Sequence, residues 1–200
     1  MFFVFPQGDR RARLYTSITP GQRDRYAGSA GVARFLNDFR RLSCLPQGPA
    51  LANGTPIGPC ATYGGENTWT DQPFVEGVVL IGDAAGYSNP IVGQGLSMAM
   101  RDARQVSEAV LDGSDLTLGG LSAYAEERRE RSRRVHFVAD LYVDLYMTFL
   151  PQGAARRLRI YDRLQNAEDP AAMCFVSVMV GPNRSPNWVY TDDFRFDILH

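Results

Sequence analysis

Residues 77–103 read GVVLIGDAAGYSNPIVGQGLSMAMRDA, and this stretch decides the predicted fold. Four consecutive apolar residues, Val78–Ile81, lie between two glycines, a pattern typical of a strand buried on both faces of a parallel sheet. The small residues of Gly82–Gly86 end the strand. Because ligands of open α/β sheets bind beyond the carboxyl ends of strands, the segment after Ile81 is a candidate binding site.

A helix is predicted to follow this segment. It starts at Gly93-Gln94-Gly95 and runs to about Leu111, with Asp112-Gly113 as its stop signal. The first turn of a helix carries unpaired backbone N–H groups and the positive end of the helix dipole, which suit an anion or an electron-rich carbonyl. The apolar residues of this helix share one stripe: Leu96, Met100, Ala103, Val106 and Val110.

The segment after the strand contains Asp83, whose carboxylate suits the hydroxyl groups of a sugar or polyol. Gly82 and Ala84 beside it leave room for a ligand. Each feature alone has an ordinary structural explanation, because a lone Asp more often caps a turn. Gly93-x-Gly95 also departs from the dinucleotide fingerprint, since Met98 stands at the third glycine position. The joint occurrence of these features after a predicted buried strand favours a binding site.

The residues before this stretch predict a hairpin and one helix. Phe2–Phe5 and Arg11–Ile18 have strand patterns, and the turn residues Pro6–Asp9 lie between them. Val32–Leu45 has apolar residues at helical spacing. The Pro- and Gly-rich segment 46–65 is expected to be irregular or to hold one short strand, and to link two structural regions.

The residues after this stretch predict further helices. Leu121–Leu150 has a charged first half and an apolar second half, and is expected to form a helix in one or two pieces. Its Arg128–Arg134 cluster, interleaved with Glu, is interpreted as a solvated face. A shorter helix is predicted over Ala154–Leu164. Met173–Val180 fits either a strand or a buried helix, and the tail from Gly181 is expected to wrap a surface.

Composition excludes several classes of function. All 21 basic residues are Arg, so the chain has no Lys for a Walker A loop or a pyridoxal Schiff base. A net charge of -1 provides no field that would attract nucleic acid or an anionic membrane. No apolar run is long enough for a transmembrane helix. Three Cys without a C-x-x-C motif and two His predict no metal site, and reduced thiols favour a cytoplasmic protein.

The stretch 77–103 resembles the second flavin-binding motif of FAD-dependent monooxygenases of the para-hydroxybenzoate hydroxylase type. Their pattern is approximately G-D-A-A-H-x-x-x-P-x-x-G-Q-G-x-N-x-x-x-x-D-A. The chain departs from it at Gly86, where the family commonly has His, and at Ser97, where the family commonly has Asn. The opening hairpin is similar to a strand pair of the same family's substrate domain. The matching positions are Gly82, Asp83, Ala84, Ala85, Pro90, Gly93, Gln94, Gly95, Asp102 and Ala103.

This resemblance implies that FAD is the cofactor. Asp83 would hydrogen-bond the ribityl chain, Pro90 would lie beside the isoalloxazine ring, and the backbone of 93–96 would hold the pyrimidine end. The implied cofactor-binding residues are Gly82, Asp83, Ala84, Pro90, Gly93, Gln94, Gly95 and Leu96.

The family's G-x-G-x-x-G unit, which holds the ADP half of FAD, and its middle Asp-Gly motif do not occur in the chain. The resemblance therefore implies an α/β (α+β) fragment: part of a Rossmann-like FAD-binding domain, part of the substrate-domain β-sheet, and C-terminal helices. The expected regions are a partial substrate-binding sheet (1–65), the second FAD motif (66–112), and a helical region with a tail (113–200). Alone, such a chain should bind FAD poorly and expose apolar surface. A separately encoded N-terminal half is a candidate partner.

The implied activity is that of a monooxygenase that uses NAD(P)H and O2 to hydroxylate or epoxidise an aromatic or polyketide-like molecule. Two alternatives stay open: an FAD-dependent reductase or halogenase relative, and a non-catalytic remnant. No acid–base residue is nominated, because the cofactor carries the chemistry. Arg13, Tyr15 and Trp69 are candidate substrate-side residues that also fit strand-surface or packing roles, and His136 is expected to be structural.

Overall fold

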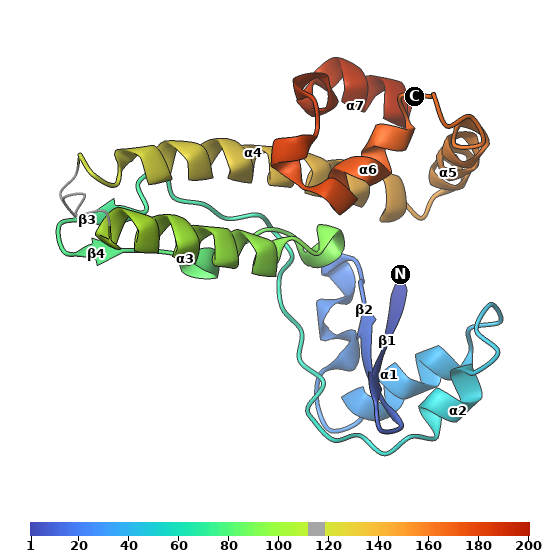
Figure 1. Ribbon diagram of the computed structural model, residues 1–200. Coiled ribbons are helices and arrows are strands. Elements are labelled where there is room, and N and C mark those ends of the chain that lie inside the picture. Colours follow the sequence, from blue (N-terminus) through green and yellow to red (C-terminus); the bar gives the residue numbers. More distant parts are fainter. Residues whose placement is uncertain (112–118) are drawn as a thin grey trace. The chain divides into compact units, whose positions relative to one another are not determined.

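The computed structural model describes residues 1–111 and 119–200. The chain divides into two compact units, Met1–Gly64 and Gly65–His200 (Figure 1). The regular elements of the described residues are helices and two small antiparallel sheets, in agreement with a mixed α/β or α+β fragment. The first unit holds the predicted hairpin, and the second holds the predicted binding segment.

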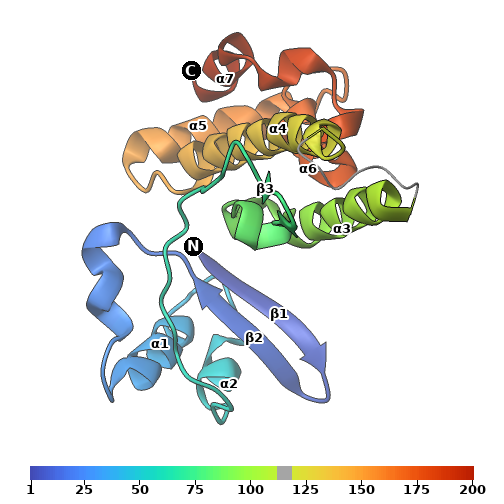
Figure 2. The ribbon, with the colours of Figure 1, turned by 90° about the vertical axis from the view of Figure 1, so that its left-hand side faces the viewer.

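The predicted hairpin is confirmed. Strands β1 (Phe2–Gly8) and β2 (Arg11–Thr16) pair antiparallel (Figure 2). The turn lies later than predicted, at Asp9 and Arg10, because Pro6 and Gly8 still pair with β2 around an irregularity in register. Asp9 and Arg10 have φ of 48° and 57°, the left-handed conformation of a two-residue turn that matches strand twist.

Helix α1 (Gly31–Arg40) packs against this hairpin. Phe39 is completely buried, and the Phe2 ring meets it edge-on with 5.1 Å between ring centres. The helix ends before the predicted limit at Leu45. The segment predicted to be irregular instead contains a short helix, α2 (Gly48–Ala52).

The predicted strand at Val78–Ile81 is present only in part, and its expected burial on both faces is wrong. Strand β4 (Val78–Val79) pairs antiparallel with β3 (Phe74–Val75). Leu80 and Ile81 remain 37% and 40% exposed. Val79 packs against the buried cluster of Phe74, Leu121 and Ala125, while β3 is the sole strand hydrogen-bonded to β4 in the described part of the chain, so β4 does not lie inside a wider sheet there.

Helix α3 (Gly95–Leu111) confirms the helix predicted after the glycines, while its predicted stop at Asp112-Gly113 lies outside the described residues. The apolar stripe of α3 is largely exposed, with Leu96 at 77% and Met100 at 66%. The buried face instead carries Met98 and Asp102. A carboxylate buried in a helix needs partners on a neighbouring element.

Helix α4, which runs beside α3 in the second unit, is continuous (Figure 1). Met173–Val180 proves to be helical, which decides between the two predicted forms. No helix in the described ranges is long and apolar enough to cross a bilayer. The bounds of these helices are α4 (Ser122–Tyr146), α5 (Pro151–Arg163), α6 (Ala172–Val180) and α7 (Asp192–Leu199).

The core of the second unit lies around the second half of α4. Leu141 and Leu145 are almost fully buried, together with Cys174 of α6 and Ile198 of α7. The tail from Gly181, predicted to wrap a surface, also contributes to this core, because Val189 is completely buried in it. The same helix α4 also lies against the predicted binding segment at Pro90–Val92.

Candidate functional site

The candidate site is built on a tight turn of 3-10 helix, η2 (Gly82–Ala85), that Gly86 closes. The turn lies against the start of α3, since a side chain added at Gly82 would come within 3.1 Å of the Ala99 Cβ. Gly86 donates its backbone N–H to the Asp83 carbonyl at 3.2 Å. The small residues of the motif thus allow the turn and α3 to approach closely.

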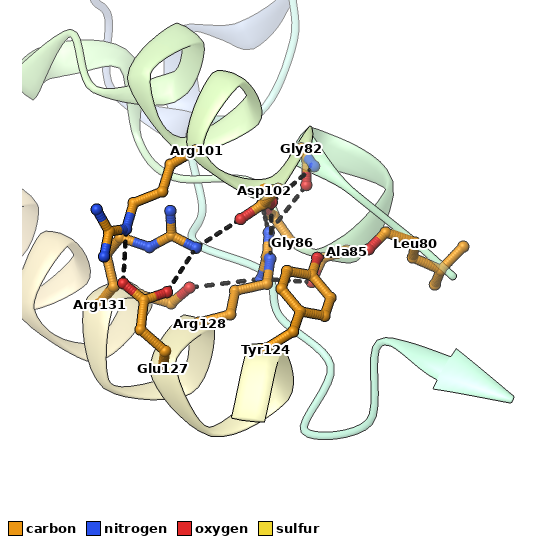
Figure 3. A network of polar contacts seen from close by, with 11 residues as sticks. Leu80, Gly82, Ala85, Gly86, Arg101, Asp102, Tyr124, Glu127, Arg128 and Arg131 are labelled. Atoms are coloured by element: carbon orange, nitrogen blue, oxygen red, sulfur yellow. Dashed lines mark hydrogen bonds and ion pairs between the residues drawn. The ribbon is translucent and has the colours of Figure 1, made fainter. Parts of the chain in front are cut away.

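Asp102 of α3 ties this turn to α4 (Figure 3). Its side chain is completely buried. Oδ2 accepts hydrogen bonds from the Gly82 backbone N–H at 2.9 Å and from Arg128 Nε at 3.0 Å. Oδ1 accepts a hydrogen bond from Arg131 Nη2. The motif residue Asp102 therefore holds the turn and two arginines together.

Arg128 binds the other side of the turn (Figure 3). Its Nη2 donates to the Gly82 carbonyl at 2.9 Å and lies 3.4 Å from the Gly86 carbonyl. Its Nη1 donates to the Ala85 carbonyl at 3.0 Å and lies 3.4 Å from Ser132 Oγ. A planar guanidinium, with five N–H donors in a fixed fork, suits this set of acceptors.

The interpretation of 128–134 as a solvated face is wrong for two of its arginines. Arg128 is 2% exposed and Arg131 is 3% exposed, because both pair with Asp102. The sequence contains a signal for this burial: the apolar positions Val135 and Val138 extend backward at helical spacing to these arginines and to Tyr124. This spacing does not reveal that a carboxylate on another helix, Asp102, would pair with the two arginines.

Further contacts extend the network. Glu127 accepts from Arg101 Nε at 2.7 Å and lies 3.2 Å from Arg131 Nη2. The Tyr124 hydroxyl donates to the Leu80 carbonyl at 2.7 Å, and burial raises the pKa of Tyr124 to about 12. The network contains three guanidinium groups and two carboxylates, so the positive charges outnumber the negative ones by one.

Asp83 and the start of α3 are the open part of the site. Asp83 is exposed, and its carboxylate has no hydrogen-bond partner among the described residues. The backbone N–H groups of Leu96 and Ser97 likewise find no acceptor in that part of the chain. A side chain added at Gly93 or Gly95 would meet no atom within 4 Å. The donors and the carboxylate are therefore accessible to a ligand.

The other predicted cofactor-binding residues have mixed environments. The Gln94 side chain donates to the Val178 carbonyl of α6 at 2.7 Å, and its backbone carbonyl accepts the Met98 N–H at 2.9 Å, so its backbone N–H is the group left for a ligand. Pro90 is exposed and begins a 3-10 turn, η3 (Pro90–Val92), which Asn89 caps through the Ile91 N–H. Ala84 is exposed. Ala84 and Pro90 are thus open to solvent, whereas the Gln94 side chain is tied to α6.

The structure explains why His is absent from position 86. Gly86 has φ of 144°, and a Cβ there would lie 2.7 Å from the Thr68 carbonyl oxygen and 2.8 Å from the Trp69 Cα. The two segments are hydrogen-bonded, with Thr68 N–H donating to the Tyr87 carbonyl at 2.8 Å. The backbone of 68–69 therefore occupies the space that the family's common His side chain would need.

Trp69 and His136 pack together at the edge of the site. Their ring centres are 5.8 Å apart, and Trp69 is 64% exposed. Tyr15 contacts Phe5 edge-on in the hairpin, and Arg13 is exposed on the same strand. These positions agree with packing and strand-surface roles, and the structure assigns no catalytic contact to these four residues.

His136 should make stability depend on pH. Burial lowers its pKa below the ordinary value of 6.5, so the folded unit prefers neutral imidazole. The unfolded chain then binds more protons below pH 6.5, and stability is lost as pH falls through that range. We expect His136→Gln to reduce the drop in melting temperature between about pH 7.5 and about pH 5.5. An unchanged drop in this variant would contradict the role of His136.

Similar proteins include reductases. Two digeranylgeranylglycerophospholipid reductases of Methanopyrus kandleri are 29% identical over 138 residues and 25% identical over 134. One from Methanothrix thermoacetophila is 28% identical over 130 residues. These alignments cover 66%, 64% and 63% of the chain and 34%, 32% and 30% of the relatives. The chain therefore spans about a third of the length of the curated relatives it matches.

No family model and no solved structure matches the chain significantly. The names of the three relatives support an oxidoreductase and give no support to the para-hydroxybenzoate hydroxylase type. Among the described residues, no group of three His, Cys, Asp or Glu side chains is placed to hold a metal ion.

Proposed function

We propose that this chain is the flavin-binding and C-terminal portion of an FAD-dependent oxidoreductase that reduces its substrate. The observation that carries the proposal is an exposed Asp83 in a turn that packs against α3, a helix whose N-terminus at Gly93–Leu96 is open. Gly82 of the same turn is bonded to Asp102 of that helix, so both parts belong to one rigid arrangement. This donor set fits a ligand with hydroxyl groups and an electron-rich carbonyl.

The residues of the site would divide the recognition of FAD. Asp83 would accept hydrogen bonds from the ribityl hydroxyls. The N–H groups of Leu96 and Ser97, with the α3 dipole, would favour electron density on the pyrimidine end. Pro90 would lie beside the ring. When bound, FAD supplies hydride and electron transfer.

Two features support a reductase with a long apolar substrate. The relatives are named as reductases of digeranylgeranylglycerophospholipid. Leu96 and Met100 present exposed apolar side chains at the start of α3, where such a substrate could pack. NAD(P)H or another donor would supply the electrons.

The motif from Gly82 to Ala103 favours a second candidate, a monooxygenase acting on an aromatic or polyketide-like substrate. Oxygen dependence separates the two candidates. Conversion of substrate by reduced FAD without O2 supports the reductase. A strict requirement for O2, with an oxygen atom in the product, supports the monooxygenase.

A glycine-rich nucleotide-binding unit, on the same polypeptide or on another, would hold the ADP half of FAD. The proposal has two supports: the chain spans about a third of its relatives, and the described residues contain no glycine-rich pyrophosphate cradle. Exposed Leu80 and Ile81 are apolar surface that such a unit could cover.

The test is a titration of the chain with FAD, followed by flavin fluorescence. We expect weak, saturable binding that desalting removes. Riboflavin should compete with FAD, because the chain contacts the flavin half, whereas AMP should not compete. Absence of saturable binding, or equal competition by AMP, would contradict the proposal.

Gly95→Ala should separate binding from stability. We expect FAD affinity to fall about tenfold, because a methyl group would enter the space left for the ligand. Stability should stay the same or rise by about 0.4–1 kcal/mol, because Ala restricts the unfolded chain. FAD titration and urea unfolding measure the two effects. Gly58→Ala, also in open space, is the control: it should change stability in the same way and leave FAD affinity unchanged.

A further inference from the structure

Arg128 makes more contacts with the binding turn than a simple ion pair needs. The backbone carbonyls of Gly82, Ala85 and Gly86 all lie within 3.4 Å of its terminal nitrogens. Its Nε binds Asp102, which in turn accepts the Gly82 N–H. The guanidinium therefore contacts the turn at both ends, on either side of the exposed Asp83.

The contacts saturate the donors of Arg128. Nε, Nη1 and Nη2 carry five N–H groups, and five acceptors are present: Asp102, Ala85, Ser132, Gly82 and Gly86. A lysine has three donors at one point and does not reproduce this fork.

Arg131 provides a natural comparison. It is equally buried and binds the same Asp102, but none of its hydrogen bonds reaches the turn. Its Nε and Nη1 have no hydrogen-bond partner among the described residues. The two arginines thus share burial and counter-charge and differ in contact with Gly82–Gly86.

We propose that Arg128 is a positioning residue that holds the turn Gly82–Gly86 so that Asp83 meets the flavin ribityl chain. This inference rests on the proposed function. Arg128 itself does not touch the flavin. It acts through the backbone of the turn. Asp102 binds its Nε and so orients the guanidinium group toward the three carbonyls.

The experiment compares Arg128→Lys with Arg131→Lys in the full chain. Each replaces one buried guanidinium by an ammonium. We expect Arg128→Lys to weaken FAD binding about tenfold, the effect of one misplaced charged hydrogen bond. Arg131→Lys should stay within about twofold of the unchanged chain. Thermal unfolding confirms that both variants are folded at the titration temperature.

A double-mutant cycle with Asp83→Asn distinguishes positioning from general loosening. If Arg128 acts through Asp83, Arg128→Lys has little further effect on FAD binding once Asp83 is changed. If Arg128→Lys does not fold, Arg128→Met replaces it. That variant keeps the buried stem and leaves Asp102 paired with Arg131 and Glu127 paired with Arg101.

Hydrogen exchange of the Gly82 and Gly86 amides gives a readout without flavin. Both amides are hydrogen-bonded within the turn or to Asp102, and they should exchange faster in Arg128→Lys than in Arg131→Lys. Equal exchange, equal FAD affinities in the two variants, or additive effects in the cycle would overturn the inference. If the unchanged chain binds no FAD, the proposed function fails, and exchange alone decides whether Arg128 holds the turn.

Discussion

Asp102→Ala is expected to lower the free energy of unfolding of the Gly65–His200 unit by about 3–5 kcal/mol. Asp102 is completely buried between Arg128 and Arg131. Without it, two guanidinium groups remain in the interior with one fewer carboxylate, and the Gly82 N–H loses its acceptor. Removing one partner of a buried ion pair costs far more than the pair contributes, because the other charge stays desolvated.

Urea unfolding of the unchanged chain and of the Asp102→Ala variant measures this difference in the free energy of unfolding. Glu108→Ala is the control, since Glu108 and Arg104 form an ion pair on the same helix with both side chains more than 60% exposed. An exposed pair of this kind contributes at most about 1 kcal/mol. Similar losses in the two variants would show that Asp102 is not the buried tie between α3, α4 and the turn.

Gly86→His, which restores the residue common in the resembled family, is expected to destabilise the same unit by about 2–6 kcal/mol. Two costs add. A non-glycine residue at φ of 144° is strained by about 1–3 kcal/mol. Its Cβ would also overlap the backbone at Thr68 and Trp69, which costs about 1–3 kcal/mol.

Gly86→Ala carries both costs without the imidazole ring, since it adds the Cβ alone, and should lose most of the same stability. Gly95→Ala is the matched control, because Gly95 has open space around it and no positive φ. Thermal unfolding of the three variants tests the prediction. A stable Gly86→His variant would mean that the segment 68–69 can move away from the turn.

Local patterns predicted local structure well in this chain. The alternation in the hairpin and the glycines before α3 placed elements that the structure contains. The local patterns gave wrong predictions where the burial of a segment depends on elements distant in the sequence. Val78–Ile81 has the composition of a two-sided strand, yet one short partner, β3, pairs with it in the described chain. Met173–Val180 was undecidable because its apolar run has no period that separates strand from helix.

In the candidate site, too, some residues could be proposed from the sequence and others only from the tertiary structure. The motif alone makes Asp83, Gly93 and Gly95 candidates, since small residues and a carboxylate after a strand are recognisable by spacing. The roles of Asp102 and Arg128 came from the tertiary structure, because their 26-residue separation has no periodicity to reveal it.

The sequence by itself determined that this chain has a glycine-rich turn leading into a helix, with Asp83 beside it, because backbone conformation follows from neighbouring residue types. Only the tertiary structure decided which charges are buried. Arg128 and Arg131 look like surface residues among the glutamates of α4, and packing against α3 makes them interior partners of Asp102. The physical reason is that burial of a charge depends on a counter-charge: helical spacing can place both arginines on the face of Val135 and Val138, but only folding brings Asp102 to them from another helix.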